Sequence, residues 1–238
     1  MRVKRGFPEV IIFDMDGVLV DVRGSFLRTT LDTVRHFTGK RVTMAQLFQW
    51  KNRSGFNDDW ITSHAWVRAL GGRQSFAEVK KKYQELYWGQ NSDGNANRER
   101  WLLPPAALRR LAKRAEVSVF TGRTYQELNH TLDRFKVRDL FHRIVTVEDV
   151  KKGKPDPEGL FQILHGRSPD RAVYIGDNVD DARAAQSAAM PFLGILPRGS
   201  EARKQGKAQL LELGALHVLG NITDIESWLA RAALWNRP

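Results

Sequence analysis

The chain has no cysteine among its 238 residues, and its six histidines are scattered without a close pair. The missing cysteines exclude disulfides, thiolate catalysis and Cys-based zinc or iron–sulfur sites, and the histidine spacing disfavours an all-histidine metal site. This composition suits a reducing compartment, and we therefore expect a cytoplasmic protein.

The beginning of the sequence also lacks a long apolar run. Arg2, Lys4 and Arg5 are followed by Val10–Phe13, an apolar run that ends after four residues at Asp14. A signal peptide or a membrane span needs a longer run. We expect a soluble protein with no membrane partner.

Acidic residues are too few to balance lysine and arginine, and the net charge is +11. Basic surfaces attract polyphosphates, so this charge invites a nucleic-acid interpretation. The excess is spread, however, with +6 over residues 21–102 and +5 over the remainder. Local clusters at 80–82 and 109–114 fall on predicted helices, where a solvated face is the simpler explanation. Nucleic acid is therefore disfavoured, and a small anionic substrate fits the same charge.

Short apolar, β-branched runs recur outside the middle of the chain, and helix-like segments separate most of them. This alternation predicts βαβ units and a parallel sheet. Two helix starts fit the capping box, Thr124–Glu127 and Thr223–Glu226. The strand-like runs are Val10–Phe13, Val117–Phe120, Ile144–Val147, Ala172–Ile175, Phe192–Ile195 and His217–Leu219.

Residues 21–102 differ from the rest, because they contain helical patterns and no convincing strand. We expect a helical insertion over 21–102 in a core domain made of 1–20 and 103–238. Five of the seven tryptophans lie in or beside this insertion, where we expect them to supply buried area more than a ligand platform. The predicted helices are Gly24–Phe37, Asn57–Leu70 and Ser75–Trp88.

Four of the strand-like runs stop at, or shortly before, residues with chemical use. Parallel sheets bind ligands beyond the carboxyl ends of their strands, so these residues are expected to converge on one pocket. Closely spaced carboxylates beside one lysine and one threonine repel each other unless a hard cation lies among them, and Mg²⁺ prefers such oxygen ligands. We expect a phosphate-binding magnesium site built from Asp14, Asp16, Thr121, Lys154, Asp177 and Asp181.

The order Asp-x-Asp-Gly-Val, Thr-Gly-Arg, Lys-Pro and Gly-Asp-x-x-x-Asp resembles the four motifs of the haloacid dehalogenase-like (HAD) hydrolases. The resemblance runs from residue 10 to about residue 195 and is vague inside the insertion. It implies an α/β fold with a Rossmann-like parallel core and an inserted helical cap of the C1 type, as in subfamily I. About thirty residues separate Thr121 from Lys154, which leaves no room for the other type of cap.

The resemblance also implies a role for each motif residue. Asp14 is the expected nucleophile and Asp16 the expected general acid and base. Asp14, Asp177 and the backbone carbonyl of Asp16 are expected to bind Mg²⁺, with Asp181 acting directly or through water. Thr121 and Lys154 are expected to hold the phosphoryl oxygens.

Further residues are expected to contact the substrate. Gly17 and Gly122 would allow close backbone approach. Arg123 replaces the lysine that more commonly ends the second motif. In the family a cap loop at about residues 51–57 helps to select the substrate, so Lys51, Arg53 and Asn57 are candidates, with a plain connecting loop as the alternative.

Several functions stay open at this point. Hydrolysis of a small phosphorylated metabolite leads, and a sugar phosphomutase is the alternative on the same scaffold. Dehalogenation and phosphonate cleavage are disfavoured, because those branches lack the second aspartate of the first motif, here Asp16. A non-catalytic, basic protein that binds a polyanion or a protein partner is the alternative from another class, and both monomer and homodimer remain open.

Overall fold

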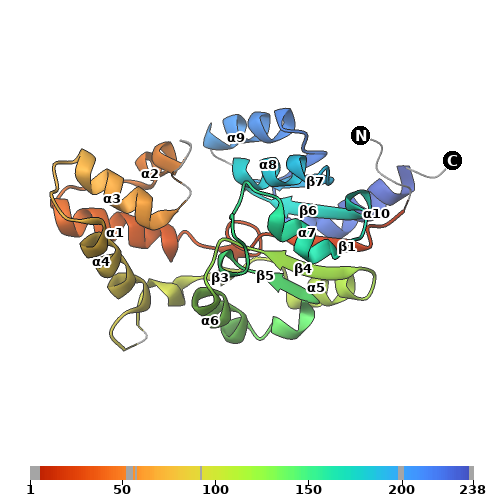
Figure 1. Cartoon of the computed structure of the whole chain (residues 1–238), viewed down its shortest axis with the longest axis horizontal. Coiled ribbons are helices and arrows are strands. Elements are labelled where there is room, and N and C mark those ends of the chain that lie inside the picture. Colours follow the sequence, from red (N-terminus) through yellow and green to blue (C-terminus); the bar gives the residue numbers. More distant parts are fainter. Residues whose placement is uncertain (1–5, 52–55, 57, 92, 198–200, 236–238) are drawn as a thin grey trace. The chain divides into compact units, whose positions relative to one another are not determined.

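The computed structural model describes residues 6–51, 56, 58–91, 93–197 and 201–235. The chain forms two compact units (Figure 1). The core unit comprises Met1–Val20 and Trp101–Pro238, and the helical unit comprises Asp21–Arg100. Among the described residues, no helix combines the length and the apolar character that crossing a membrane requires.

A six-stranded parallel sheet forms the centre of the core unit, as far as the described residues go. Its spatial order is β5-β4-β1-β6-β7-β8, so the first strand of the chain lies in the middle. The parallel α/β architecture predicted from the sequence is confirmed. The strands are β1 (Val10–Phe13), β4 (Glu116–Phe120), β5 (Arg143–Val145), β6 (Ala172–Gly176), β7 (Phe192–Ile195) and β8 (His217–Leu219).

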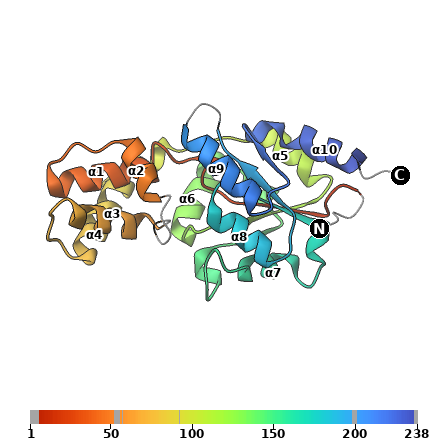
Figure 2. The same ribbon diagram turned by 90° about the horizontal axis from the view of Figure 1, so that it is seen from above.

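Helices cover both faces of this sheet, which explains why its central strands are continuously apolar. All four residues of β1 are at most 1% exposed. Helices α5 (Pro105–Ala112) and α10 (Ile225–Trp235) lie on one face, and α7 (Glu158–Leu164) and α8 (Val179–Ser187) lie on the other (Figure 2). The remaining helices of the core unit are α6 (Tyr125–Phe135) and α9 (Glu201–Glu212).

The strand register brings the chemical motifs to one edge. Phe13 at the end of β1 pairs with Val119 on one side and with Ile175 on the other. Asp14 therefore leaves the sheet beside Thr121 and Asp177, which each follow two residues after the partners of Phe13.

Two local predictions in the core unit need correction. Val147 was expected to end a strand, but it begins the 3-10 turn Val147–Asp149, which the Thr146 side chain caps. Thr223 was expected to cap the last helix, but Asn221 caps a preceding 3-10 turn by accepting the Thr223 N–H at 3.0 Å. Asn ranks above Thr as an N-cap residue, which favours the earlier start at Asn221. The Thr124–Glu127 capping box is confirmed.

The helical unit contains the helices α1 (Phe26–Thr38), α2 (Met44–Lys51), α3 (Asp59–Ala69) and α4 (Phe76–Trp88). Helix α2 was not predicted, and only Leu47 of its side chains is buried, so it lacks a long apolar stripe. The absence of strands was also an incorrect expectation. Val20–Asp21 (β2) and Arg100–Trp101 (β3), where the chain passes between the units, pair as a two-stranded sheet.

Aromatic side chains build the interior of the helical unit. Trp66 is 4% exposed and belongs to an apolar cluster that Trp50 packs against. Tyr83 and Tyr87 belong to a second cluster, against which Trp60 and Trp88 pack. These four tryptophans thus contribute packing area inside the helical unit.

Close packing of α7 on the sheet predicts a sensitivity to one added methyl group. A Cβ at Gly159 would lie 2.2 Å from a ring carbon of Phe120, whereas a Cβ at Gly153 would meet Val147 at an ordinary 3.7 Å. We expect Gly159→Ala to lower the free energy of unfolding by about 1–3 kcal/mol, the usual cost of overpacking a core. Chemical denaturation checks this, with Gly153→Ala as a near-neutral control; equal stabilities for the two variants would contradict it.

Candidate active site

Asp14 lies at the centre of a buried polar cluster at the carboxyl edge of the sheet. Its backbone N–H donates to the Ile175 carbonyl at 2.8 Å, which continues the β1–β6 ladder by one residue. Only 3% of Asp14 is exposed. Burial raises the pKa of Asp14 well above its ordinary range; the charge of Lys154 opposes this rise, and neighbouring carboxylates reinforce it.

Lys154 is the cation of this cluster. Its ammonium donates to Asp14 Oδ1 at 2.7 Å, to Asp181 Oδ1 at 2.8 Å and to the Tyr174 hydroxyl at 3.2 Å. Burial alone would lower the pKa of Lys154, but the two carboxylates raise it above its ordinary value. The lysine is therefore charged, and its three N–H donors all have partners.

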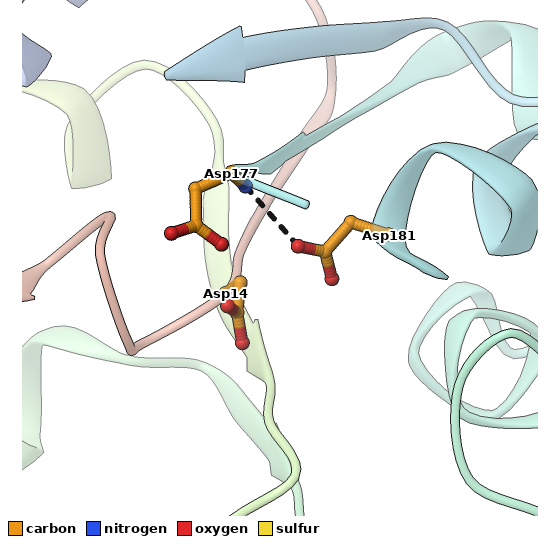
Figure 3. Close-up of side chains that lie close together, drawn as sticks. All are labelled: Asp14, Asp177 and Asp181. Carbon is orange, nitrogen blue, oxygen red and sulfur yellow. Dashed lines mark hydrogen bonds between the residues drawn. The ribbon is translucent and has the colours of Figure 1, made fainter. Parts of the chain in front are cut away.

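Asp177 and Asp181 come from the loop and helix that follow β6 (Figure 3). One carboxylate oxygen from each of Asp14, Asp177 and Asp181 lies within 4.8 Å of the other two. Desolvation raises the pKa of Asp177 to about 7, and the charge of Asp181 adds to this effect. Three carboxylates face the single ammonium of Lys154, so the donor set is hard and carries excess negative charge, which fits a divalent cation.

The protein already uses both oxygens of Asp181. Oδ1 accepts from Lys154 and from the Tyr174 hydroxyl at 2.6 Å, and Oδ2 accepts the backbone N–H groups of Asp177 at 3.1 Å and Asn178 at 3.3 Å. A carboxylate has about four lone-pair sites, so these four contacts occupy them. Asp14 and Asp177 are thus better placed than Asp181 to offer oxygens to a cation.

Two glycines are required by this arrangement. Gly17 has a φ of +76°, and a Cβ there would lie 1.9 Å from Asp177 Oδ2. A Cβ at Gly176 would lie 2.4 Å from that of Asp181. By contrast, a Cβ at Gly122 would meet no described atom within 4 Å, and the expected approach of a substrate to the Gly122 backbone stays a prediction.

Asp16 and Arg123 form an ion pair. Arg123 donates from Nε at 2.8 Å and from Nη2 at 2.5 Å, both to Asp16 Oδ1. The Arg123 side chain is 1% exposed and that of Asp16 is 35% exposed. Arg123 was expected to bind substrate, and in the structure its buried guanidinium binds Asp16.

Thr121 follows β4 and is 1% exposed. Its backbone N–H donates to the Val145 carbonyl at 3.0 Å, and its hydroxyl oxygen accepts the Arg123 N–H at 3.2 Å. The core unit therefore brings Asp14, Lys154, Asp177 and Asp181 into one cluster, and pairs Asp16 with Arg123.

Three residues of the helical unit were expected to contact the substrate, and only Lys51 lies in the described part of the chain. Lys51 is paired with Asp59 at 3.0 Å, and both side chains are 18% exposed. Asp59 also accepts from the Thr30 hydroxyl at 3.2 Å. Arg53 and Asn57 lie outside the described residues.

Sequence reasoning missed Tyr174 and Thr131. Tyr174 is fully buried in β6. Thr131 belongs to α6, and its hydroxyl oxygen accepts a hydrogen bond from Arg123 Nη1. The signal for Tyr174 was a hydroxyl in an otherwise apolar strand, two residues before Gly176. Thr131 gave no comparable signal, because a threonine in a helix is ordinary.

Comparison with known proteins identifies the family to which these motifs belong. The chain matches the family described as haloacid dehalogenase-like hydrolase over residues 11–195. It is 32% identical over 197 residues to an imidazoleglycerol-phosphate dehydratase of Phytophthora nicotianae, covering 79% of this chain but only 43% of that protein. It is 25% identical over 198 residues to a phosphoglycolate phosphatase of Pseudomonas putida, covering 79% of this chain and 69% of the relative.

Solved structures show the same fold. A predicted phosphoglycolate phosphatase from Haemophilus somnus superposes with a TM-score of 0.74 at 19% identity, covering 92% of this chain and 97% of that one. A HAD family hydrolase from Deinococcus radiodurans, solved with bound phosphate and sodium, gives a TM-score of 0.72 at 21% identity and covers 97% and 98%.

The carboxylate cluster predicts how stability responds to pH. The folded-state pKa of Asp177 lies near 7, above the ordinary value of 3.8, so the metal-free fold loses stability as the pH rises through this window. Asp177→Asn removes the part of this loss that comes from Asp177, while the raised pKa of Asp14 still contributes. We expect the melting temperature of the metal-free variant to fall less than that of the wild type between pH 4 and about 7, as measured by calorimetry.

The same variant is expected to lose the response to Mg²⁺. A cation at 100 times its dissociation constant stabilises the wild type by about 2.7 kcal/mol, and Asp177→Asn abolishes most of this gain. Asp180→Asn is the matched control, because Asp180 is the neighbouring carboxylate outside the cluster. If Mg²⁺ stabilised Asp177→Asn as much as it stabilised the wild type, Asp177 would not be a ligand of the cation.

Proposed function

Because the chain belongs to the haloacid dehalogenase-like hydrolase family, we propose that it is a magnesium-dependent phosphatase acting on a small phosphomonoester. The observation that carries this proposal is the buried contact between Lys154 and Asp14 beside the carboxylates of Asp177 and Asp181. Relatives named as phosphoglycolate phosphatases support the hydrolysis of a phosphate ester, and one named as a pyrophosphatase supports phosphoryl transfer to water more generally.

Asp14 is the proposed nucleophile. One of its carboxylate oxygens attacks phosphorus, the bond from phosphorus to the ester oxygen breaks, and an aspartyl-phosphate forms. Lys154 touches Asp14 Oδ1, so its charge favours the ionised carboxylate that this attack requires. The other oxygen of Asp14 is then the one available for attack.

Asp16 is the proposed general acid and base. It protonates the departing alcohol oxygen in the first step and takes a proton from water in the second. That water attacks the phosphorus of the aspartyl-phosphate, which releases inorganic phosphate and restores the Asp14 carboxylate. The partial exposure of the Asp16 side chain is compatible with both exchanges.

Mg²⁺ is the proposed cofactor, held by carboxylate oxygens of Asp14 and Asp177 and by the backbone carbonyl of Asp16. When bound, it would neutralise charge that develops on the phosphoryl oxygens. Thr121 and Lys154 are the proposed protein contacts of those oxygens, with Lys154 exchanging one of its present partners for a phosphoryl oxygen. Asp181 would act by holding Lys154 and the loop at Asp177 in place.

The helical unit is the proposed cap, which would contribute substrate selectivity. Lys51, Arg53 and Asn57 remain the proposed contacts, and the Lys51–Asp59 ion pair then fixes the end of α2 against the beginning of α3. A small phosphorylated metabolite is the proposed substrate, and phosphoglycolate is the first compound to test because of the named relatives.

Replacing the nucleophile tests this function. We expect Asp14→Asn to lower kcat for p-nitrophenyl phosphate with Mg²⁺ by about a thousandfold or more, because the acceptor of the phosphoryl group is lost. The fold should persist, since the substitution removes one of several crowded negative charges. Borohydride reduction during turnover should convert Asp14 of the wild type to homoserine, which peptide mass spectrometry detects.

Two outcomes would count against the proposal. Wild-type protein with no phosphatase activity under any divalent cation would remove the enzyme interpretation. Undiminished activity in Asp14→Asn would remove the nucleophile. Sugar phosphates in the substrate panel distinguish the alternatives, because a phosphomutase returns an isomeric sugar phosphate and a phosphatase returns inorganic phosphate.

A further inference from the structure

Arg123 has a deeply buried charged side chain at the edge of the site. The proposed mechanism gives this side chain no role. It is 1% exposed, and it is the largest fully buried side chain in the described part of the chain. Burying a guanidinium is costly unless hydrogen bonds and an opposite charge compensate it. Here the compensating charge comes from Asp16, a residue of the proposed chemistry.

The contact between the two side chains is asymmetric. Both Nε and Nη2 of Arg123 donate to Asp16 Oδ1, at 2.8 and 2.5 Å. Among the described residues, no hydrogen bond reaches Asp16 Oδ2. One oxygen is thus anchored, while the other is left to carry or accept a proton.

The anchor itself is fixed at its far end. Arg123 Nη1 donates to the hydroxyl of Thr131, and that hydroxyl donates to the Glu127 carbonyl at 3.1 Å within α6. Glu127 in turn closes the capping box with Thr124, the residue after Arg123. The guanidinium is therefore connected to the first two turns of a helix.

The backbone of Arg123 is held as well. Its N–H donates to the Thr121 hydroxyl oxygen at 3.2 Å, and its carbonyl accepts from the Val147 N–H at 3.3 Å. A site residue held through a rigid element keeps its geometry better than one held by a loop alone. Asp16 lies in the turn after β1, so its connection to α6 through Arg123 supplies this rigidity.

We infer that Arg123 is a positioning residue for Asp16, which holds Oδ1 and directs Oδ2 toward proton exchange with the leaving alcohol and with water. This inference rests on the proposed phosphatase function. Arg123 does not bind the phosphoryl group, because its guanidinium is buried and committed to Asp16 and Thr131. A purely structural ion pair is the alternative that the experiment must exclude.

The dependence of the rate on the leaving group separates these roles. An alkyl phosphate needs a proton on its departing oxygen, whereas 2,4-dinitrophenyl phosphate releases a stable anion and needs none. We expect Arg123→Gln to lower kcat/KM for an alkyl phosphate about 100-fold and for 2,4-dinitrophenyl phosphate by less than about 5-fold. The ratio of the two values is the readout, and it is independent of the folded fraction of a sample.

Two related variants test the chain of contacts. Thr131→Val removes the partner of Nη1 without touching Asp16, so we expect the same preference with a smaller change in the ratio. Arg123→Lys keeps the charge but loses the forked contact, and is expected to recover only part of the alkyl phosphate activity.

Arg143→Gln is the control, because Arg143 is a partly buried arginine that contacts the Gln162 carbonyl and not the site. Its ratio should equal that of the wild type.

A double variant completes the test. If Arg123 acts through Asp16, Arg123→Gln causes no further loss of alkyl phosphate activity once Asp16→Asn is present. Equal losses for both leaving groups, or additive losses in the double variant, would overturn the inference while leaving the phosphatase intact. Wild-type protein that hydrolyses neither ester would instead overturn the function on which the inference rests.

Discussion

The contact of the Lys154 ammonium with Asp14 and Asp181 is the interaction on which the site depends. One buried cation joins a strand end, a loop and the first turn of a helix that are far apart in sequence. Without it, three carboxylates would lie together in a desolvated place, where like charges are costly. Lys154 reduces that cost only in part, and the remaining negative charge fits a metal site among Asp14, Asp177 and Asp181.

The sheet explains why these groups meet. β1 lies between β4 and β6, so Asp14 leaves the sheet with one neighbour on each side. The packing of Gly159 on Phe120 sets α7, the helix that follows the Lys154 loop, against the sheet. Gly17 and Gly176 then admit the side chains of Asp177 and Asp181 at distances that no Cβ allows. The two glycines thus provide the space in which the carboxylates lie close together, and Lys154 provides the charge that partly balances them.

The sequence predicted the sheet well, because apolar runs buried on both faces are conspicuous and parallel strands align their carboxyl ends. It predicted the meeting of Asp14 with Asp177 for the same reason. It could not predict that Arg123 binds Asp16, since that contact depends on how α6 packs and not on spacing. Nor could it find Tyr174, whose hydroxyl matters only once Lys154 and Asp181 lie beside it. Helix α2 escaped because its buried surface is small.

The pairing of β2 with β3 has a consequence for how such a protein can evolve. The chain leaves the core unit at Val20 and returns at Trp101, and both crossings belong to one two-stranded sheet. The eighty residues in between therefore enter and leave at a single place. Insertions, deletions or wholesale replacement inside that segment need not shift the register of β1, which is fixed by both of its neighbours. The sequence of the inserted segment can thus change without altering the strands that carry the chemical motifs.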